Sequence, residues 1–288
     1  MDYVTLLIQI LNGIQFGLLL FLVASGLTLI FGIMGVINLA HGSFYMIGAY
    51  LAFSLAQKIG NLWLAIFIGL LLTIALGYLI EKIFISRLYR RDHLYQVLFT
   101  YGLILIFEES RSILVGDDVH SVAIPKLLDF SIPLSDNLSY PVYRLFISVV
   151  CLALAAGMYS LIQKTRLGMM IRAGASNREM AQSLGIDINR LFAWMFAAGV
   201  ALAALAGMIA APVSTVFPGM GNQVLIICLV VVVIGGIGSI KGAFFSALLI
   251  GQVDTFGKVL MPQLAGIAVY LLMAAVLLWR PEGLFKRS

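Results

Sequence analysis

Long apolar runs separated by short charged segments are the feature of this sequence that most restricts its fold. Hydrophobic residues make up 62% of the 288 residues, whereas Asp, Glu, Lys and Arg together make up only 11%. A soluble domain carries about 25% charged residues, so this chain has too few to cover a water-exposed surface. Since no long polar domain interrupts the apolar runs, the sequence predicts an integral membrane protein whose residues 1–288 form one transmembrane domain.

The apolar runs predict an all-α, polytopic bundle of transmembrane helices, because about 20 apolar residues suffice for a helix to cross a bilayer. The expected helices are 5–33, 40–58, 62–85, 94–115, 142–163, 190–211, 223–239, 242–260 and 264–280. We expect eight or nine crossings, because Gly26, Gly32 or Gly35 can break the long first run. Whether that run crosses once or twice decides the side of the N-terminus, which the sequence leaves open.

Small residues predict how these helices pack. The pairs Gly13-x-x-x-Gly17 and Gly238-x-x-x-Gly242 and the small-residue run 197–211 fit the patterns that let helix backbones approach closely in lipid. We therefore expect tight helix contacts at these positions and no part in chemistry.

The basic residues gather in three segments, which predicts the orientation of the chain. Twelve of the 18 Lys and Arg lie in 81–93, in 164–190 (the basic loop) and in the tail from Arg280, whereas the loop 116–141 holds four Asp and one Lys. Because cytoplasmic loops carry an excess of Lys and Arg, we expect the three basic segments and the C-terminus in the cytoplasm and 116–141 on the other side. The net charge of +5 then reflects topology and does not indicate nucleic-acid binding.

The sequence lacks the patterns of enzyme chemistry and of metal or cofactor sites. It contains no G-x-x-x-x-G-K-[ST] phosphate loop, so the chain does not bind ATP by that route. The three His lie in different segments, and Cys151 and Cys228 lie in separate apolar runs, where buried free thiols are expected. We therefore expect no enzyme, no cofactor and no metal site. A secondary transporter, a passive channel and the membrane subunit of a pump with a separate ATPase remain.

Asn38, His41 and Ser43 are candidates for a substrate path. They lie between two apolar runs in the glycine-rich stretch 32–50, which favours an interrupted helix. Backbone groups that such a break frees can bind a polar substrate where they line a cavity. The alternative is an ordinary turn between two spans, with Asn38 as a helix N-cap and His41 at the membrane interface.

Two further charged clusters have both local and functional interpretations. Glu108, Glu109 and Arg111 either form an intramembrane ion pair or reach the headgroup level. Asp254 and Lys258, close to Gln252, are four residues apart, which is the spacing of a local ion pair on one helix face. An ion-coupled secondary transporter would use Glu108, Glu109 or Asp254 as its coupling site.

The basic loop carries the signals of a short helix with both ends specified. Ser176 and Glu179 have the Ser-x-x-Glu spacing of a capping box, and Gly185 follows as a natural C-cap. The predicted helix, from about Asn177 to Leu184, is ~12 Å long. A helix this short is unstable in isolation, so packing must stabilise it.

The side chains of this short helix suggest what it packs against. Met180 and Leu184 offer an apolar stripe to a partner protein or to the membrane domain, and Arg172 and Arg178 offer charge to an acidic cleft. The helix therefore either docks on another protein or rests on the lipid headgroups as an amphipathic linker.

Four blocks of the sequence resemble the membrane permease subunits of branched-chain amino acid (LIV-type) ABC transporters. These blocks are GLTLIFGIMGVINLAHGSFYMIGAYLA at 26–52, IEKIFISRLYRRDHLYQVLFTYGLILIFEE at 80–109, LGMMIRAGASNREMAQSLGIDINRLFAW at 167–194 and VVVIGGIGSIKGAFFSALLIG at 231–251. The resemblance covers nearly the whole chain. Two positions depart from the family pattern, because Ser43 stands where many members have an acid and Leu88 follows Arg87 where Pro is common.

The resemblance implies an importer in the bacterial cytoplasmic membrane that carries branched-chain or similar amino acids. A homologous second permease, two cytoplasmic ATPase subunits and a periplasmic substrate-binding protein would complete it. The resemblance also implies that 172–185 is the coupling helix, seated in a groove of the ATPase. By their match to the family pattern, this role extends to Arg172, Ser176, Glu179, Leu184 and Gly185.

Overall fold

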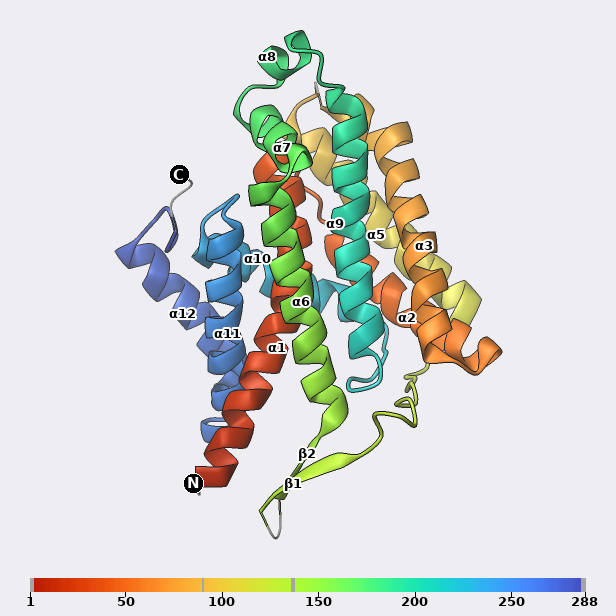
Figure 1. The fold of residues 1–288 in the computed structure, drawn as a ribbon, viewed down its shortest axis with the longest axis vertical. Coiled ribbons are helices and arrows are strands. Elements are labelled where there is room, and N and C mark those ends of the chain that lie inside the picture. Colours follow the sequence, from red (N-terminus) through yellow and green to blue (C-terminus); the bar gives the residue numbers. More distant parts are fainter. Residues whose placement is uncertain (1–2, 90, 136–137, 286–288) are drawn as a thin grey trace.

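A computed structural model describes residues 3–89, 91–135 and 138–285, which form an elongated bundle of helices (Figure 1). The helices α6 (Val142–Lys164) and α9 (Ile188–Ala210) run toward one end of the bundle and carry α7 (Arg166–Ser176) and α8 (Arg178–Ser183) there. We call this the α8 end. The opposite end, which we call the hairpin end, holds the strands β1 (Ser131–Ser135) and β2 (Leu138–Pro141).

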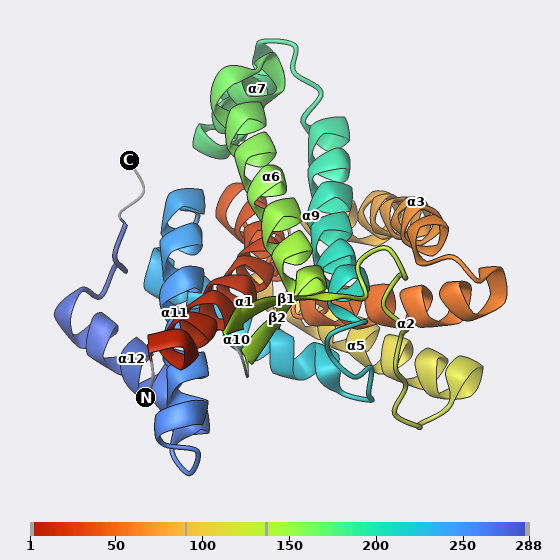
Figure 2. The ribbon, with the colours of Figure 1, turned by 60° about the horizontal axis from the view of Figure 1, so that its bottom comes forward.

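The remaining helices complete the bundle. They are α1 (Tyr3–Leu29), α2 (His41–Ile59), α3 (Leu62–Ile80), α4 (Ser86–Leu88), α5 (His93–Val115), α10 (Met220–Gly235), α11 (Ile240–Leu260) and α12 (Ala265–Trp279). Two π-helical segments, η1 (Ile30–Met34) and η2 (Glu81–Ile85), continue α1 and α3. In Figures 1 and 2, α2, α3 and α5 lie on one side of α6 and α9, and α11 and α12 lie on the other.

The apolar runs fold as the sequence predicts. Each of the nine expected segments forms a helix with ends within four residues of the predicted ones, if η1 and η2 are counted with α1 and α3. Among the described residues, five helices are both long and apolar enough to cross a membrane, and α10 and α12 are shorter apolar helices. The fold is therefore a helical membrane bundle, and the number of eight or nine crossings stays a prediction.

Small residues bring the central helices into contact. A Cβ added to Gly17 would lie 2.8 Å from the Ala247 carbonyl oxygen of α11, and one added to Gly26 would lie 2.5 Å from the Gly199 carbonyl oxygen of α9. Neither position has room for a side chain. Helix α9, which contains most of the small-residue run, is buried along nearly its whole length against α1, α2 and α3. The predicted close packing is confirmed at these positions.

The basic segments meet at the α8 end. The Arg178 guanidinium of α8 lies 5.4 Å from the ring centre of Tyr89, which belongs to the first basic segment. At the other side of this end, Leu284 of the C-terminal tail donates to the Ile234 carbonyl oxygen, where α10 finishes. The first residues of α1 lie at the hairpin end (Figure 1). The charged residues Arg90, Asp136, Lys286 and Arg287, which are counted above, lie outside the described residues.

The all-α prediction omits one element, a small antiparallel hairpin in the loop 116–141. Strands β1 and β2 pair in the register Ile132 with Tyr140, and an irregularity follows Pro133. The segment Ser131–Ser135 is short and contains Pro133, which cannot donate a hydrogen bond to a sheet, so its sequence does not predict a strand. The same loop is tied to the α9–α10 connection by paired backbone hydrogen bonds of 2.8 and 2.9 Å between His120 and Val216.

Candidate functional site

The short helix expected from about Asn177 to Leu184 is present as α8, but a second helix, α7, precedes it, so the coupling helix implied for 172–185 is broken at Asn177. Asn177 has extended backbone angles (φ −153°, ψ 107°) and separates α7 from α8. Its side chain accepts a hydrogen bond from the Met180 backbone N–H at 3.0 Å, which makes Asn177 the N-cap of α8. Ser176 is still helical as the last residue of α7, so it does not form the predicted capping box with Glu179.

The predicted end of this helix is confirmed. Gly185 has a φ of +86°, which favours glycine. Its N–H donates to the Gln182 carbonyl oxygen, and the Ile186 N–H donates to that of Ala181. These two bonds form a Schellman motif, which satisfies the last carbonyl groups of α8.

Helix α8 turns its apolar stripe away from the membrane domain. Met180 is 64% exposed and Leu184 is 76% exposed, whereas Ala181 on the opposite face is buried. Glu179 is exposed beside them. Of the two surfaces that the sequence offered for this stripe, the fold leaves only the outer one. Exposed apolar side chains at the tip of a protruding element are typical of a contact surface.

Arg172 and Arg178 both donate to backbone carbonyl groups of this chain, and a contact of either with an acidic cleft of a partner stays a prediction. Arg178 donates a hydrogen bond to the Met34 carbonyl oxygen at the end of η1. Its guanidinium also lies over the rings of Phe192 (4.8 Å) and Tyr89 (5.4 Å). Arg172 donates to the Ile162 carbonyl oxygen of α6. Cations interact favourably with the C-terminal ends of helices, where carbonyl groups lack helical partners.

Tyr89 and Glu81 join this network and were missed by sequence reasoning. The Tyr89 hydroxyl donates to a Glu81 carboxyl oxygen in η2 at 2.6 Å. Burial, followed by the neighbouring Glu81, raises the pKa of Tyr89 well above its ordinary value, so the phenol keeps its proton. The available signal was Glu81, an acid that directly follows a long apolar run. Glu81 also belongs to the first basic segment, whose positive charge dominates that stretch of sequence. Arg178 thus links α8 to the two π-helical segments, and π-helical segments often mark functional sites.

The break between α1 and α2 is real, and it lies inside the protein. Gly35 ends the first helix with a φ of +66°, while α1 continues unbroken through Gly26. Gln96 accepts a hydrogen bond from the Ile37 N–H (3.4 Å), and Thr100 accepts one from the Leu39 N–H (3.2 Å). Side chains of α5 therefore satisfy the backbone that the break frees, as a hydrocarbon environment requires.

The three predicted path residues are buried at this break. The Nε2 atom of His41 lies 2.9 Å from the Val23 carbonyl oxygen, and Asn38 accepts from the Ala40 N–H at 3.1 Å. Ala40 rather than Asn38 holds the N-cap position of α2. Within the described residues, Nδ2 of Asn38 and Nδ1 of His41 have no hydrogen-bond partner. Ser43 is also buried, so a role for the three in a substrate path stays a prediction.

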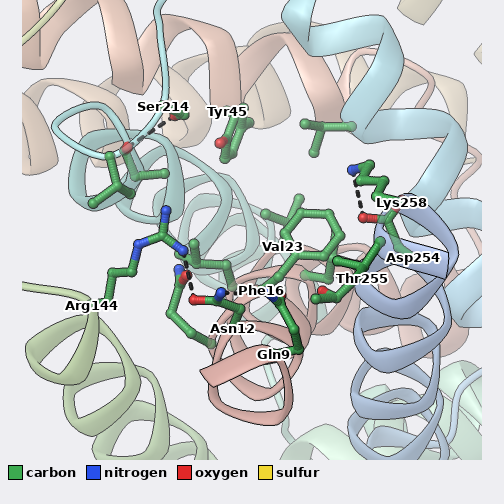
Figure 3. Close-up of a pocket in the computed structure, with 17 residues that line it drawn as sticks. Gln9, Asn12, Phe16, Val23, Tyr45, Arg144, Ser214, Asp254, Thr255 and Lys258 are labelled. Carbon is green, nitrogen blue, oxygen red and sulfur yellow. Dashed lines mark hydrogen bonds and ion pairs between the residues drawn. The ribbon is translucent and has the colours of Figure 1, made fainter. Parts of the chain in front are cut away.

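A cavity of about 400 Å³ extends from Gln9 and Asn12, near the start of α1 at the hairpin end, to Val23 and Tyr45 (Figure 3). Arg144 of α6 points into it from one side, and the Asp254–Lys258 pair of α11 lies on the other. Arg144 donates to the Asn12 side-chain oxygen at 2.8 Å. Since Val23 lines the cavity and its carbonyl contacts His41, the cavity floor adjoins the break between α1 and α2.

The other charged clusters form ion pairs. Lys258 and Asp254 are 2.6 Å apart, which confirms the predicted pair on one helix face. Arg111 lies 3.6 Å from Glu108 and 2.8 Å from Asp117, at the end of α5. Hydrogen bonds from Arg111 and Ser112 lower the pKa of Asp117, so it stays charged. Glu108 and Asp254, two of the three acids that an ion-coupled transporter would use, are thus paired with cations, whereas Glu109 forms no ion pair among the described residues.

Comparison with known proteins identifies the family of this chain. A model of the family described as "branched-chain amino acid transport system / permease component" matches residues 9–278. The chain belongs to this family. Its members are transport permeases and not enzymes, in agreement with the sequence. A search of solved structures finds none that matches.

Relatives of this permease span nearly the whole chain. The high-affinity branched-chain amino acid transport system permease protein BraD of Pseudomonas aeruginosa is 32% identical and covers 97% of this chain and 95% of its own length. LivH of Salmonella typhimurium, with the same description, is 30% identical with the same coverage. LivM of Escherichia coli is 24% identical, over 91% of this chain and 67% of its own length.

Proposed function

We propose that this permease is the transmembrane subunit of an ATP-driven importer for branched-chain or similar amino acids. The family relation supports the transport role. The energy source is inferred from the shape of α8, which presents Met180 and Leu184 outward and is fixed inward through Arg178. This combination of an exposed apolar face and an inward anchor is the observation that carries the proposal.

The inward contacts give the coupling a physical path. ATPase subunits bound to the face formed by Met180 and Leu184 would move α8 when they close on ATP. Arg178 would carry the movement to the Met34 carbonyl and so to the break at Gly35. The π-helical turns at η1 and η2 favour such movement, because an extra residue per turn allows a shift in register. No covalent chemistry takes place in this subunit.

The remaining parts of the importer follow from the relatives and from the missing phosphate loop. Escherichia coli has two homologous proteins, LivH and LivM, with the same transport-system description, so a homologous second permease is the expected partner. Two ATPase subunits must supply ATP hydrolysis, because this chain lacks the loop for it. A periplasmic binding protein would deliver the substrate at the hairpin end.

The proposed location is the bacterial cytoplasmic membrane, with the α8 end in the cytoplasm. The basic segments that meet at this end follow the positive-inside rule. The C-terminal tail then lies in the cytoplasm and the start of α1 outside. The substrate would enter through the cavity between Arg144 and Asp254, which we call the outer cavity, and would pass the break at Asn38, His41 and Ser43. There Asn38 and His41 each have a buried polar atom with no hydrogen-bond partner among the described residues.

The coupling proposal is tested by two leucines of similar exposure at opposite ends of the molecule. Leu184 of the α8 end is 76% exposed, and Leu127 of the loop 116–141 is 81% exposed. We expect Leu184→Asp to abolish co-purification of the ATPase subunits, because a carboxylate replaces an apolar contact. Leu127→Asp should leave co-purification unchanged. Equal recovery of the ATPase with both variants would overturn the assignment of α8.

The energy source has its own test. Amino-acid uptake into cells should stop when ATP is depleted and should persist when an uncoupler collapses the proton gradient while ATP is maintained. The opposite result would identify an ion-coupled secondary transporter. Flux without accumulation against a gradient would identify a passive channel.

A further inference from the structure

We propose that the outer cavity is a binding site for a zwitterionic, aliphatic α-amino acid, held by Arg144 at its carboxylate and by Asp254 at its ammonium group. The inference rests on the proposed transport function and deepens it, since it names the residues that the substrate meets. The site lies between α1, α6 and α11, on the hairpin side of the break between α1 and α2.

Arg144 supplies the first half of the site. Its guanidinium points into the cavity, and Asn12 holds it there by the 2.8 Å hydrogen bond (Figure 3). Asn12 is itself bonded to Gln9. Arg144 forms no ion pair with a carboxylate in the described part of the chain. A planar guanidinium binds a carboxylate through two parallel hydrogen bonds, so the α-carboxylate of an amino acid fits this position.

The position of Arg144 along its helix supports a ligand role. It lies in the first turn of α6, next to the positive end of the helix dipole. A cation is unfavourable at that end, so helix stability does not explain an arginine there. An anion bound at Arg144 would interact favourably with both the guanidinium and the helix end.

Asp254 supplies the second half of the site. The residue is buried, and one carboxylate oxygen, Oδ2, accepts from Lys258 at 2.6 Å. A carboxylate has two oxygens and about four acceptor positions, so the substrate ammonium can share it. Figure 3 shows this pair on the side of the cavity opposite Arg144, so a bound molecule can meet a cation and an anion in the same cavity.

The rest of the lining fits the apolar part of the substrate. The walls toward the floor are formed by the apolar side chains of Phe16, Leu19, Leu20, Val23 and Val224. The volume of about 400 Å³ is within the range of small-molecule sites. Burying a charged substrate is costly unless each charge is paired, and this cavity offers a partner for each charge and apolar side chains for the aliphatic part.

The proposal is tested in the complete importer, reconstituted in proteoliposomes with radiolabelled L-leucine. We expect Arg144→Gln to lower ATP-driven uptake at least tenfold while the loaded binding protein still stimulates ATP hydrolysis, because coupling at α8 is intact. Lys126→Gln removes a positive charge in the same outer region but outside the cavity, and it should transport like the wild type. Equal uptake by Arg144→Gln and wild type would overturn the site.

A labelling experiment covers the case in which Arg144→Gln does not assemble. Thr255 lines the cavity, and both native cysteines are buried, so Thr255→Cys gives one accessible thiol in it. Leucine-loaded binding protein should slow the reaction of this thiol with a membrane-impermeant reagent several-fold more than the unloaded protein does. Equal rates would overturn the site. If the wild-type importer accumulates no amino acid, the transport proposal fails as well, whereas uptake without protection removes the site alone.

Discussion

At the residue scale, Arg178 shows how one side chain can join a surface helix to the membrane domain. It contacts the Met34 carbonyl oxygen and the rings of Tyr89 and Phe192, which belong to three different segments. A guanidinium can stack on rings and donate several hydrogen bonds at once, whereas an ammonium cannot reproduce that geometry. The sequence identified Arg178 as a loop cation, but the direction of its side chain depends on the carbonyl and rings around it.

Replacement of Arg178 should therefore weaken both the fold and the coupling. We expect Arg178→Ala to lower the free energy of unfolding by about 1.5–3 kcal/mol, the range for a hydrogen bond to a charged group. The measurement is denaturant unfolding of the purified protein in detergent, together with ATP-driven uptake.

Arg190→Ala is the control, because Arg190 lies in the same loop with an exposed ion pair to Asp187. An exposed pair contributes about 0–1 kcal/mol, so this variant should unfold nearly like the wild type. If both variants lose the same stability, Arg178 is not an anchor.

At the element scale, the two short helices of the basic loop depend on Asn177. Both Ser176 and Asn177 are good N-cap residues by type, and the Ser-x-x-Glu spacing favoured Ser176. The fold selects Asn177, because α7 continues through Ser176 and only the next residue has extended backbone angles. The residue that caps α8 therefore depends on where α7 ends, and the Ser-x-x-Glu motif does not specify that position.

The two cap candidates can be separated by substitution. Asn177→Ala should destabilise α8 by about 1 kcal/mol, because the Met180 N–H loses its acceptor. Backbone amides of α8 should then exchange hydrogen about fivefold faster by mass spectrometry. Ser176→Ala should leave exchange in α8 unchanged. A larger effect at Ser176 would restore the capping box that the sequence suggested.

At the scale of the whole molecule, the charged segments sort to opposite ends of the bundle. The elements that carry the basic segments meet at the α8 end, and the acidic loop 116–141 lies at the hairpin end. The break between α1 and α2 and the floor of the outer cavity lie between these ends, joined by the contact of His41 with Val23. The proposed transport cycle uses this arrangement, with the ATPase acting at the α8 end and the substrate entering from the hairpin end.

The two ends should be labelled from opposite sides of the membrane. Lys126→Cys in the loop 116–141 should react with an impermeant maleimide added to intact spheroplasts, whereas Glu179→Cys in α8 should react only in inverted vesicles. Cys151 and Cys228 are buried and should contribute little background. Reaction of both thiols from the same side would contradict the proposed topology.

The sequence by itself determined the positions of the nine apolar helices, the family and the grouping of basic charges, because these depend on local hydropathy and on residue type. It also located Gly185 as a helix end and Asp254 and Lys258 as a pair, since both involve neighbours along one helix. Only the tertiary structure decided the Asn177 cap, the inward turn of Arg178 and the placement of Arg144 and Asp254 around one cavity. Those features join residues up to 144 positions apart, and such contacts exist only after the helices have packed.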